Sequence, residues 1–159
     1  MLFRSGDNLY FYAPNPTFWI DPSGLLRCRK KILERDVYQD DSIFDGGKPD
    51  LEKIDWEALN SPSFDKLKSL LNAGKTNKEL MELGYAPFGY DGKQVNLHHV
   101  IGKEPGPMAE LAGSIHQKYH KPLHAIIEDG RSFRNNPKLL RKYNRYRKKY
   151  WKERAKDFC

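Results

Sequence analysis

The chain has 159 residues, enough for one domain with a buried core, and 31% of them are charged, which is typical of a globular protein with a polar surface. No apolar run approaches the roughly 18–20 residues that a membrane helix needs, so we expect no contact with a membrane. The net charge of +7 is uneven: residues 131–159 carry 12 Lys/Arg against 2 Asp/Glu, whereas residues 34–65 carry 10 acidic side chains against 3 basic ones. Such asymmetry favours a nucleic-acid-binding protein, although a lopsided solvated surface would also account for it.

The first 25 residues are rich in aromatic residues, Pro and Gly. The alternation in NLYFYA predicts a strand, and NPTFWIDPSG has the composition of turns. The segment lacks the order of charged, apolar and small residues that defines a signal peptide. Cys28 and Cys159 lie far apart without CxxC spacing, so they predict neither a zinc knuckle nor a disulfide framework.

Residues 26–75 are expected to form a loosely organised connector, or an N-terminal helical part of the following domain. The stretch begins basic, becomes acidic and contains the breaker GGKP. Short helical patterns follow around LEKIDWEAL and SFDKLKSLLNAG, and Pro62 favours a helix start near Ser61.

From Thr76 onward the pattern is more regular. Thr76 or Asn77 is a suitable helix N-cap, and Asp91-Gly92 is a strong hairpin signal between two strand-like runs. The predicted elements are a helix over 76–84, a hairpin around 91–92, a helix over 107–121, a short strand at 123–127 and a long helix from residue 137.

The last helix has two distinct faces. One face carries Leu139 and three tyrosines, which are Tyr143, Tyr146 and Tyr150. The opposite face carries four basic residues: Arg141, Arg145, Lys148 and Lys152. Tyrosines at helical spacing favour core packing over stacking against nucleic-acid bases.

All five histidines lie within 27 consecutive positions, and the other 132 residues have none. Imidazole is a common metal ligand and also transfers protons near neutral pH. His98 and His99 are neighbours at a predicted strand end, where successive side chains point to opposite faces. One of them can therefore bind a metal ion while the other takes a proton from a water molecule.

The remaining histidines are spaced differently. His116 and His120 share a helical face, but the sequence HQKYH lacks the glutamate of the HExxH protease motif. His124, on the predicted strand at 123–127, would lie alongside His98 in a sheet. An alternative is that two or three of the five histidines, His120 above all, only form hydrogen bonds within the fold.

The segments LMELGYAPFGYDGKQVNLHH, GPMAELAGSIH, PLH and RKKYWKER resemble the LHH family of HNH/endonuclease VII-like nucleases, over about residues 80–154. The resemblance implies an α+β fold, a small ββα-metal (HNH/treble-clef-like) core with packed helices. It implies catalytic histidines at four positions: His98, His99, His116 and His124. Glu110 matches a family position and is expected to support a histidine, whereas His120 has no counterpart.

A second resemblance covers NLYFYAPNPTFWIDPSGL, which is similar to the end of the Rhs repeat core of polymorphic toxins. The signature PxxxxDPxGL places the catalytic acid of autocleavage at Asp21 and the cleavage site after Leu25. The rest of such a core is not among these residues, so we do not expect this chain to cleave itself. The implied organisation is a core remnant at 1–25, a connector at 26–75 and a nuclease domain at 76–159.

Together these features predict a metal-dependent endonuclease toxin that acts on DNA. His98, His116 and His124 would bind a divalent Zn, Ni or Mg ion, and His99 would be the general base. Four arginines would bind phosphates: Arg131, Arg134, Arg141 and Arg145.

The Rhs resemblance further implies a cognate immunity protein and the Rhs core with its secretion apparatus as partners. The toxin would be held inactive in the producing cell and delivered to the cytoplasm of a target cell. Two alternatives stay open, a metal-dependent RNase and a non-catalytic metal-stabilised binding module. The orientation of His99 separates the second from an enzyme, because a base must face the substrate.

Overall fold

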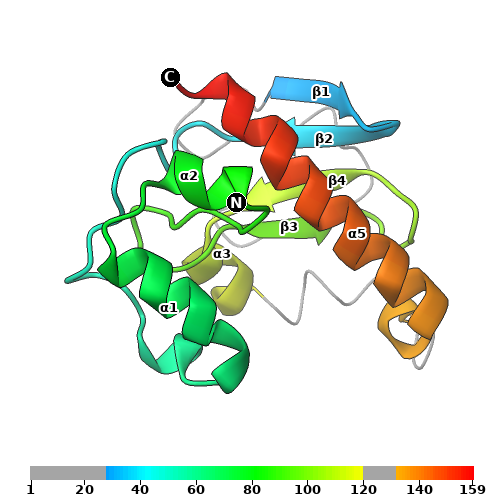
Figure 1. Ribbon diagram of the computed structural model, residues 1–159. Coiled ribbons are helices and arrows are strands. Elements are labelled where there is room, and N and C mark those ends of the chain that lie inside the picture. Colours follow the sequence, from blue (N-terminus) through cyan, green and yellow to red (C-terminus); the bar gives the residue numbers. More distant parts are fainter. Residues whose placement is uncertain (1–27, 120–131) are drawn as a thin grey trace, which may run out of the picture.

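A four-stranded mixed sheet forms the centre of the computed structural model, which describes residues 28–119 and 132–159 (Figure 1). The strand order is β1-β2-β4-β3. Strand β2 pairs antiparallel with β1 and parallel with β4, and β4 pairs antiparallel with β3. The strands are β1 (Cys28–Ile32), β2 (Arg35–Gln39), β3 (Asn96–His99) and β4 (Met108–Leu111).

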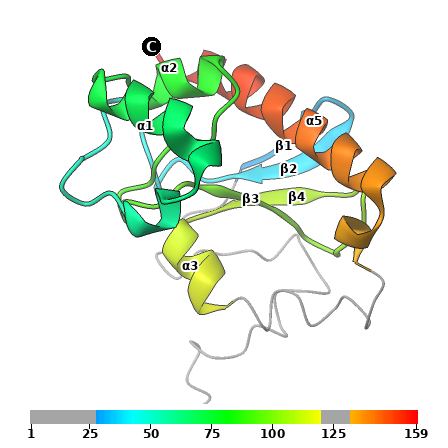
Figure 2. The ribbon, with the colours of Figure 1, turned by 60° about the horizontal axis from the view of Figure 1, so that its bottom comes forward.

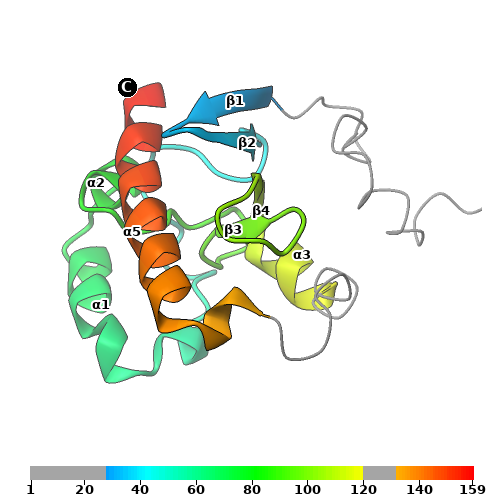
Figure 3. The same ribbon diagram turned by 90° about the vertical axis from the view of Figure 1, so that its right-hand side faces the viewer.

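Helices cover both faces of this sheet. Helix α5 (Pro137–Arg154) crosses one face, whereas the short helix α3 (Gly113–Lys118) lies on the opposite side (Figures 2 and 3). Helix α2 (Asn77–Glu82) packs beside α5, and α1 (Asp65–Asn72) shares an apolar cluster with α2. Short 3-10 turns lie at Glu57–Leu59, Pro62–Phe64, Phe133–Asn135 and Ala155–Asp157. The protein is therefore α+β, as the sequence predicts, and no helix among the described residues is both long and apolar enough to cross a membrane.

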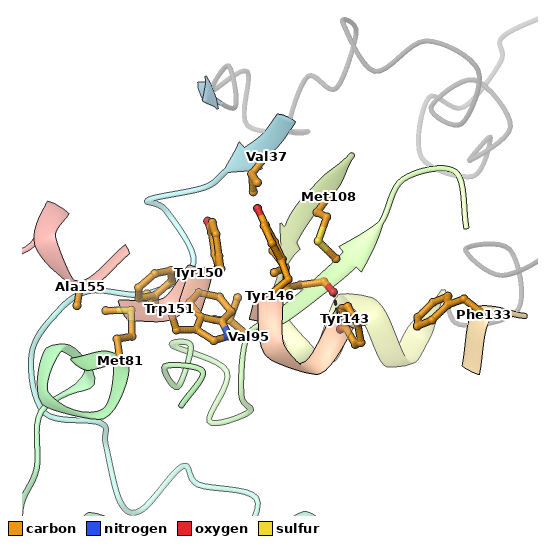
Figure 4. Packing of buried hydrophobic residues seen from close by; sticks show 12 residues of the cluster. Val37, Met81, Val95, Met108, Phe133, Tyr143, Tyr146, Tyr150, Trp151 and Ala155 are labelled. Carbon is orange, nitrogen blue, oxygen red and sulfur yellow. Dashed lines mark hydrogen bonds between the residues drawn. The ribbon is translucent and has the colours of Figure 1, made fainter. Parts of the chain in front are cut away.

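The long C-terminal helix supplies most of the core. Asn136 caps it by accepting hydrogen bonds from two backbone amides, and Pro137 occupies its first turn. Tyr143, Tyr146 and Tyr150 are buried against Val37 and other sheet residues, which confirms the predicted core role of the tyrosines (Figure 4). Each hydroxyl donates to an acceptor within the fold, so these large side chains are buried without leaving their polar atom unpaired.

The predicted helix and hairpin after Thr76 are both present. Thr76 and Glu79 form a capping box at the start of α2, which ends before Gly84 in the left-handed conformation (φ +90°). Gly92 turns the chain with φ +75°, and an isolated bridge pairs Phe88 with Gln94 just before β3. This tight turn leads β3, and with it the paired histidines, into the sheet.

The predicted helix over 107–121 is wrong in its first half. Met108–Leu111 form strand β4, and only Gly113–Lys118 are helical. All four residues of β4 are buried between two neighbouring strands. A short buried apolar run has the same pattern in a strand and in a helix, so periodicity alone could not separate them.

The segment expected to be a connector is part of this same fold. Strands β1 and β2 form a hairpin whose two turn residues, Leu33 and Glu34, have φ values of 48° and 68°. Val37 and Phe44 belong to the main core. The expected core remnant at 1–25 and the expected strand at 123–127 lie outside the described residues.

Candidate active site

Strands β3 and β4 and helix α3 follow one another in the chain and bring two histidines together. His98, on β3, pairs in register with Ala109, while His116 lies on α3. The two imidazole rings are 5.4 Å apart between centroids, at an interplanar angle of 63°. Two imidazole rings from different elements thus meet at one place between β3 and α3.

His99 points to the other face of β3, as strand geometry predicts. Its ring packs against Phe133 and Tyr143, with centroids 4.5 and 4.9 Å away. Only 5% of His99 is exposed, and its Nε2 lies 2.6 Å from Oε2 of Glu104. Burial lowers the pKa of His99 below its usual value, although Glu104 opposes this effect, so the ring is neutral at neutral pH.

Glu104, in the loop between β3 and β4, is held by Arg35 of β2. The two guanidinium nitrogens donate to the two carboxylate oxygens over 2.8 and 2.5 Å, and both side chains are buried. Burial alone would raise the pKa of Glu104, but the hydrogen bonds from Arg35 and His99 lower it below its usual value. Glu104 is therefore ionised, and Arg35 also lies 3.9 Å from the centroid of the Tyr146 ring.

His98 and His99 line one small pocket although they point to opposite faces of the sheet. This is possible because β3 is the outermost strand of the described sheet, so the pocket lies at its edge. His116, Phe133, Tyr143 and the exposed Arg134 also line it. The residues predicted to act as general base, as two metal ligands and as a phosphate-binding cation thus line one opening.

Of the other predicted phosphate-binding residues, the two that the structure describes do not line this pocket. Arg141 and Arg145 lie on α5, and both are exposed. Several predicted site residues lie outside the described part of the chain: Asp21, Leu25, His120, His124 and Arg131.

Glu110 was expected to support a histidine, but its hydrogen bonds within the described residues go to other partners. Its carboxylate accepts hydrogen bonds from Tyr150 (2.6 Å), Nε of Arg154 (2.9 Å) and the backbone amide of Asp40 (2.9 Å). Glu110 is opposite Leu97 in the β3–β4 register, on the α5 side of the sheet, whereas His98 faces α3. Glu110 therefore joins α5 and the end of β2 to the sheet.

Sequence reasoning did not find Arg35 and Glu104. Glu104 lies five residues after His99, which is a weak local signal in a turn-rich segment. Arg35 lies 69 residues from Glu104, in the stretch that was expected to be a connector. Their partnership depends on the parallel pairing of β2 with β4, which no local pattern indicates.

The residues present fit a transition-metal ion in their chemistry. Imidazole nitrogens suit zinc, nickel and similar ions better than magnesium, and His98 and His116 supply two of them. Within residues 28–119 and 132–159 there is no group of three His, Cys, Asp or Glu side chains placed to hold a metal ion. The predicted third ligand, His124, lies outside these ranges.

A strand pair followed by a helix, with histidines on the first strand and on the helix, defines a nuclease of the ββα-metal class. The family model described as "LHH: A nuclease of the HNH/ENDO VII superfamily with conserved LHH" matches residues 76–157, and the chain belongs to this family. The sequence Leu97-His98-His99 is the motif of that description. No solved structure matches the chain.

Proposed function

We propose that this nuclease is a metal-dependent endonuclease toxin that hydrolyses phosphodiester bonds in DNA. The observation that carries the proposal is the shared pocket, where a buried neutral His99 lies beside the facing rings of His98 and His116. A base and a pair of imidazole ligands at one opening meet the needs of phosphodiester hydrolysis.

His98, His116 and His124 would hold the metal ion. A divalent ion bound there supplies a Lewis acid that neutralises charge on the phosphate and stabilises the leaving oxygen. His99 takes the proton from the attacking water, because its neutral ring has a lone pair at neutral pH. Its adjacent position on β3 brings it to the same pocket from the opposite face of the strand.

Arg134 would bind the phosphate backbone at the mouth of the pocket. Its guanidinium is exposed, and its residue follows Phe133, whose ring packs on His99. A contact to phosphate carries affinity without sequence preference and weakens as salt rises. Arg134→Ala should therefore lower DNA affinity and reduce its salt dependence, with Lys66→Ala, which removes an exposed cation on α1, as the control. An equal loss of affinity in both variants would contradict a special role for Arg134.

The toxin role rests on the sequence at 1–25, which resembles the end of an Rhs core with Asp21 and Leu25 at its cleavage signature. A nuclease of this kind endangers the cell that makes it, so the proposal includes a cognate immunity protein. It also includes delivery by the Rhs core and its secretion apparatus into the cytoplasm of a target cell. Co-expression with the product of the neighbouring gene would test this: restored growth of the host supports the toxin role.

The direct test is cleavage of a supercoiled plasmid by the full chain with EDTA, Zn²⁺, Ni²⁺ or Mg²⁺. We expect metal-dependent nicking that is lost in His99→Ala while metal binding, measured by calorimetry, is retained. His98→Ala should lose both, and His120→Ala, which has no family counterpart, should keep both. Undiminished cleavage by His99→Ala would overturn the assignment of the base.

The same assay separates the alternatives. Contacts to phosphate serve RNA as well as DNA, so a labelled RNA is included as a second substrate. Cleavage of RNA alone would replace the DNase with an RNase. Binding of nucleic acid without cleavage of either polymer would favour a metal-stabilised binding module.

A further inference from the structure

We infer that Arg35 and Glu104 are positioning residues that hold His99 with its proton on Nε2 and its Nδ1 lone pair available to the substrate. The inference rests on the proposed function in one respect, the role of His99 as the base. It also makes β2 part of the catalytic unit, although the family match begins only at residue 76.

The tautomer follows from the partners of the Glu104 carboxylate. Arg35 cannot lose its proton in a protein, and its two nitrogens donate to both oxygens of Glu104. Glu104 is therefore a carboxylate, which accepts hydrogen bonds and has no proton to give. The 2.6 Å contact between Oε2 and Nε2 of His99 requires that Nε2 carry the proton. In the neutral ring, Nδ1 is then the nitrogen that can accept one.

Arg35 is itself fixed by packing. Its guanidinium lies against the ring of Tyr146, 3.9 Å from the centroid, and one of its nitrogens is 3.8 Å from the sulfur of Met108. Only 8% of Arg35 is exposed. Because a planar guanidinium binds a carboxylate through two parallel bonds, it sets the orientation of Glu104 as well as its charge.

Strand pairing brings these residues together. Val37 of β2 is opposite Met108 of β4, and Met108 is opposite His99 of β3. Arg35 begins β2 and reaches the loop that joins β3 to β4, where Glu104 lies. An arginine on β2 thus acts on a histidine on β3 through a glutamate in the loop that precedes β4.

This arrangement also suits the reaction. As the water oxygen forms its bond to phosphorus and the P–O3′ bond breaks, one water proton passes to Nδ1 of His99. The electron pair of the broken bond leaves on the 3′ oxygen. The imidazolium that results is stabilised by the adjacent carboxylate of Glu104, whose charge is already in place.

The test uses the full chain and two measurements on each variant. Long-range ¹H–¹⁵N NMR of the histidine rings gives the His99 tautomer, with His99→Gln used to assign the signals. Plasmid cleavage gives kcat and KM separately. The variants are Glu104→Gln, Arg35→Met and the conservative Arg35→Lys. The matched control is Glu110→Gln, which alters a second buried glutamate–arginine pair that contacts no histidine in the described structure.

We expect the Nε2–H tautomer in the unmodified chain and loss of that tautomer preference in Glu104→Gln. The value of kcat should fall roughly 10–100-fold in Glu104→Gln and Arg35→Met, with KM changed less than about twofold, as for residues that orient a ligand indirectly. Arg35→Lys keeps the charge and should recover part of kcat. Glu110→Gln should keep both the tautomer and the kcat of the folded protein.

An Nδ1–H tautomer in the unmodified chain would overturn the inference, as would a Glu104→Gln variant that behaves like Glu110→Gln. If Arg35→Met fails to fold, Arg35→Lys and Glu104→Gln still give both readouts. The tautomer is measured without substrate. It therefore tests the positioning of His99 even if the protein does not cleave DNA or if His99 is not its base.

Discussion

Two buried glutamate–arginine pairs lie on this sheet, and they do different work. Glu104 and Arg35 meet beside His99, whereas Glu110 and Arg154 meet beneath α5. The third partner sets the difference: a histidine ring for Glu104, but a tyrosine hydroxyl and a backbone amide for Glu110. A buried carboxylate is thus not by itself a sign of catalysis, and its remaining hydrogen bonds decide its role.

The electrostatics of the two pairs differ as well. Burial raises the pKa of Glu110 above its usual value in spite of Arg154, whereas the pKa of Glu104 is lowered. Burial disfavours the charge on Arg154, but Glu110 and Asp41 more than offset this, so the pKa of Arg154 lies above its usual range. Both pairs are buried, but the pair of Glu104 and Arg35 contacts His99, which lines the pocket.

The largest effect on stability should come from Arg154→Met, because it leaves the carboxylate of Glu110 buried without its cation. We expect a loss of about 3–5 kcal/mol in the free energy of unfolding. Urea denaturation followed by circular dichroism measures it. Cleavage per folded molecule should be unchanged. A loss of cleavage in the folded variant would show that the pair of Glu110 and Arg154 also affects catalysis.

The next effect concerns the pair at the site. Arg35→Met and Glu104→Leu should each be strongly destabilising, but the double variant should recover about 2–3 kcal/mol of the summed loss, because it leaves no unpaired charge. Cleavage should stay low in the double variant, since His99 has lost its acceptor. Recovery of cleavage along with stability would show that the pair is purely structural.

A smaller loss is expected for Tyr150→Phe, which removes the 2.6 Å hydrogen bond to Glu110. Hydrogen bonds to charged groups contribute about 2 kcal/mol, and those to neutral acceptors about 1 kcal/mol. Tyr143→Phe, which removes a 2.9 Å bond to the Leu97 carbonyl, is the matched control for thermal and urea unfolding. Equal losses in the two variants would indicate that Glu110 is not ionised.

The smallest effect is expected at a partly exposed glutamate, Glu79. Hydrogen bonds from Lys75 and from the Thr76 amide lower the pKa of Glu79 from 4.5 to about 2. The folded state therefore favours the ionised form, and this contribution is complete above pH 4.5 and is lost as pH falls from 4.5 towards 2. Glu79→Gln should flatten that part of the stability profile, measured by thermal unfolding at stepped pH values. An unchanged slope would mean that the capping box contributes nothing measurable.

Local patterns in the sequence were enough to predict several elements. The helix from Pro137, the helix after Thr76 and the turn at Gly92 all have caps or glycines at the required positions, and the structure contains all three. The opposite orientation of His98 and His99 also follows from strand geometry alone. These features depend on neighbours in the chain, so one sequence suffices to find them.

The features that were missed depend on distant partners. The β1–β2 turn uses Leu33 and Glu34 with positive φ, where Asn-Gly or Asp-Gly would have given a recognisable signal. Strand β4 is a strand because β2 and β3 lie on either side of it. The link from Arg35 through Glu104 to His99 requires both the β1–β2 turn and strand β4. For that reason the sequence pointed to His99 but not to Arg35 or Glu104.

The parallel pairing of β2 with β4 has a consequence for the order of folding. The contacts Arg35–Glu104 and Asp40–Glu110 each close a loop of about 70 residues. Such long-range contacts form late in folding, because the entropy of loop closure is lost before the contacts stabilise the chain. A chain in which the β3–β4–α3 unit has formed but β2 has not yet docked would carry its histidines with the base unaligned. Nuclease activity would therefore appear only when β2 has joined the sheet. A newly synthesised chain would be inactive for a time before it could cleave nucleic acid.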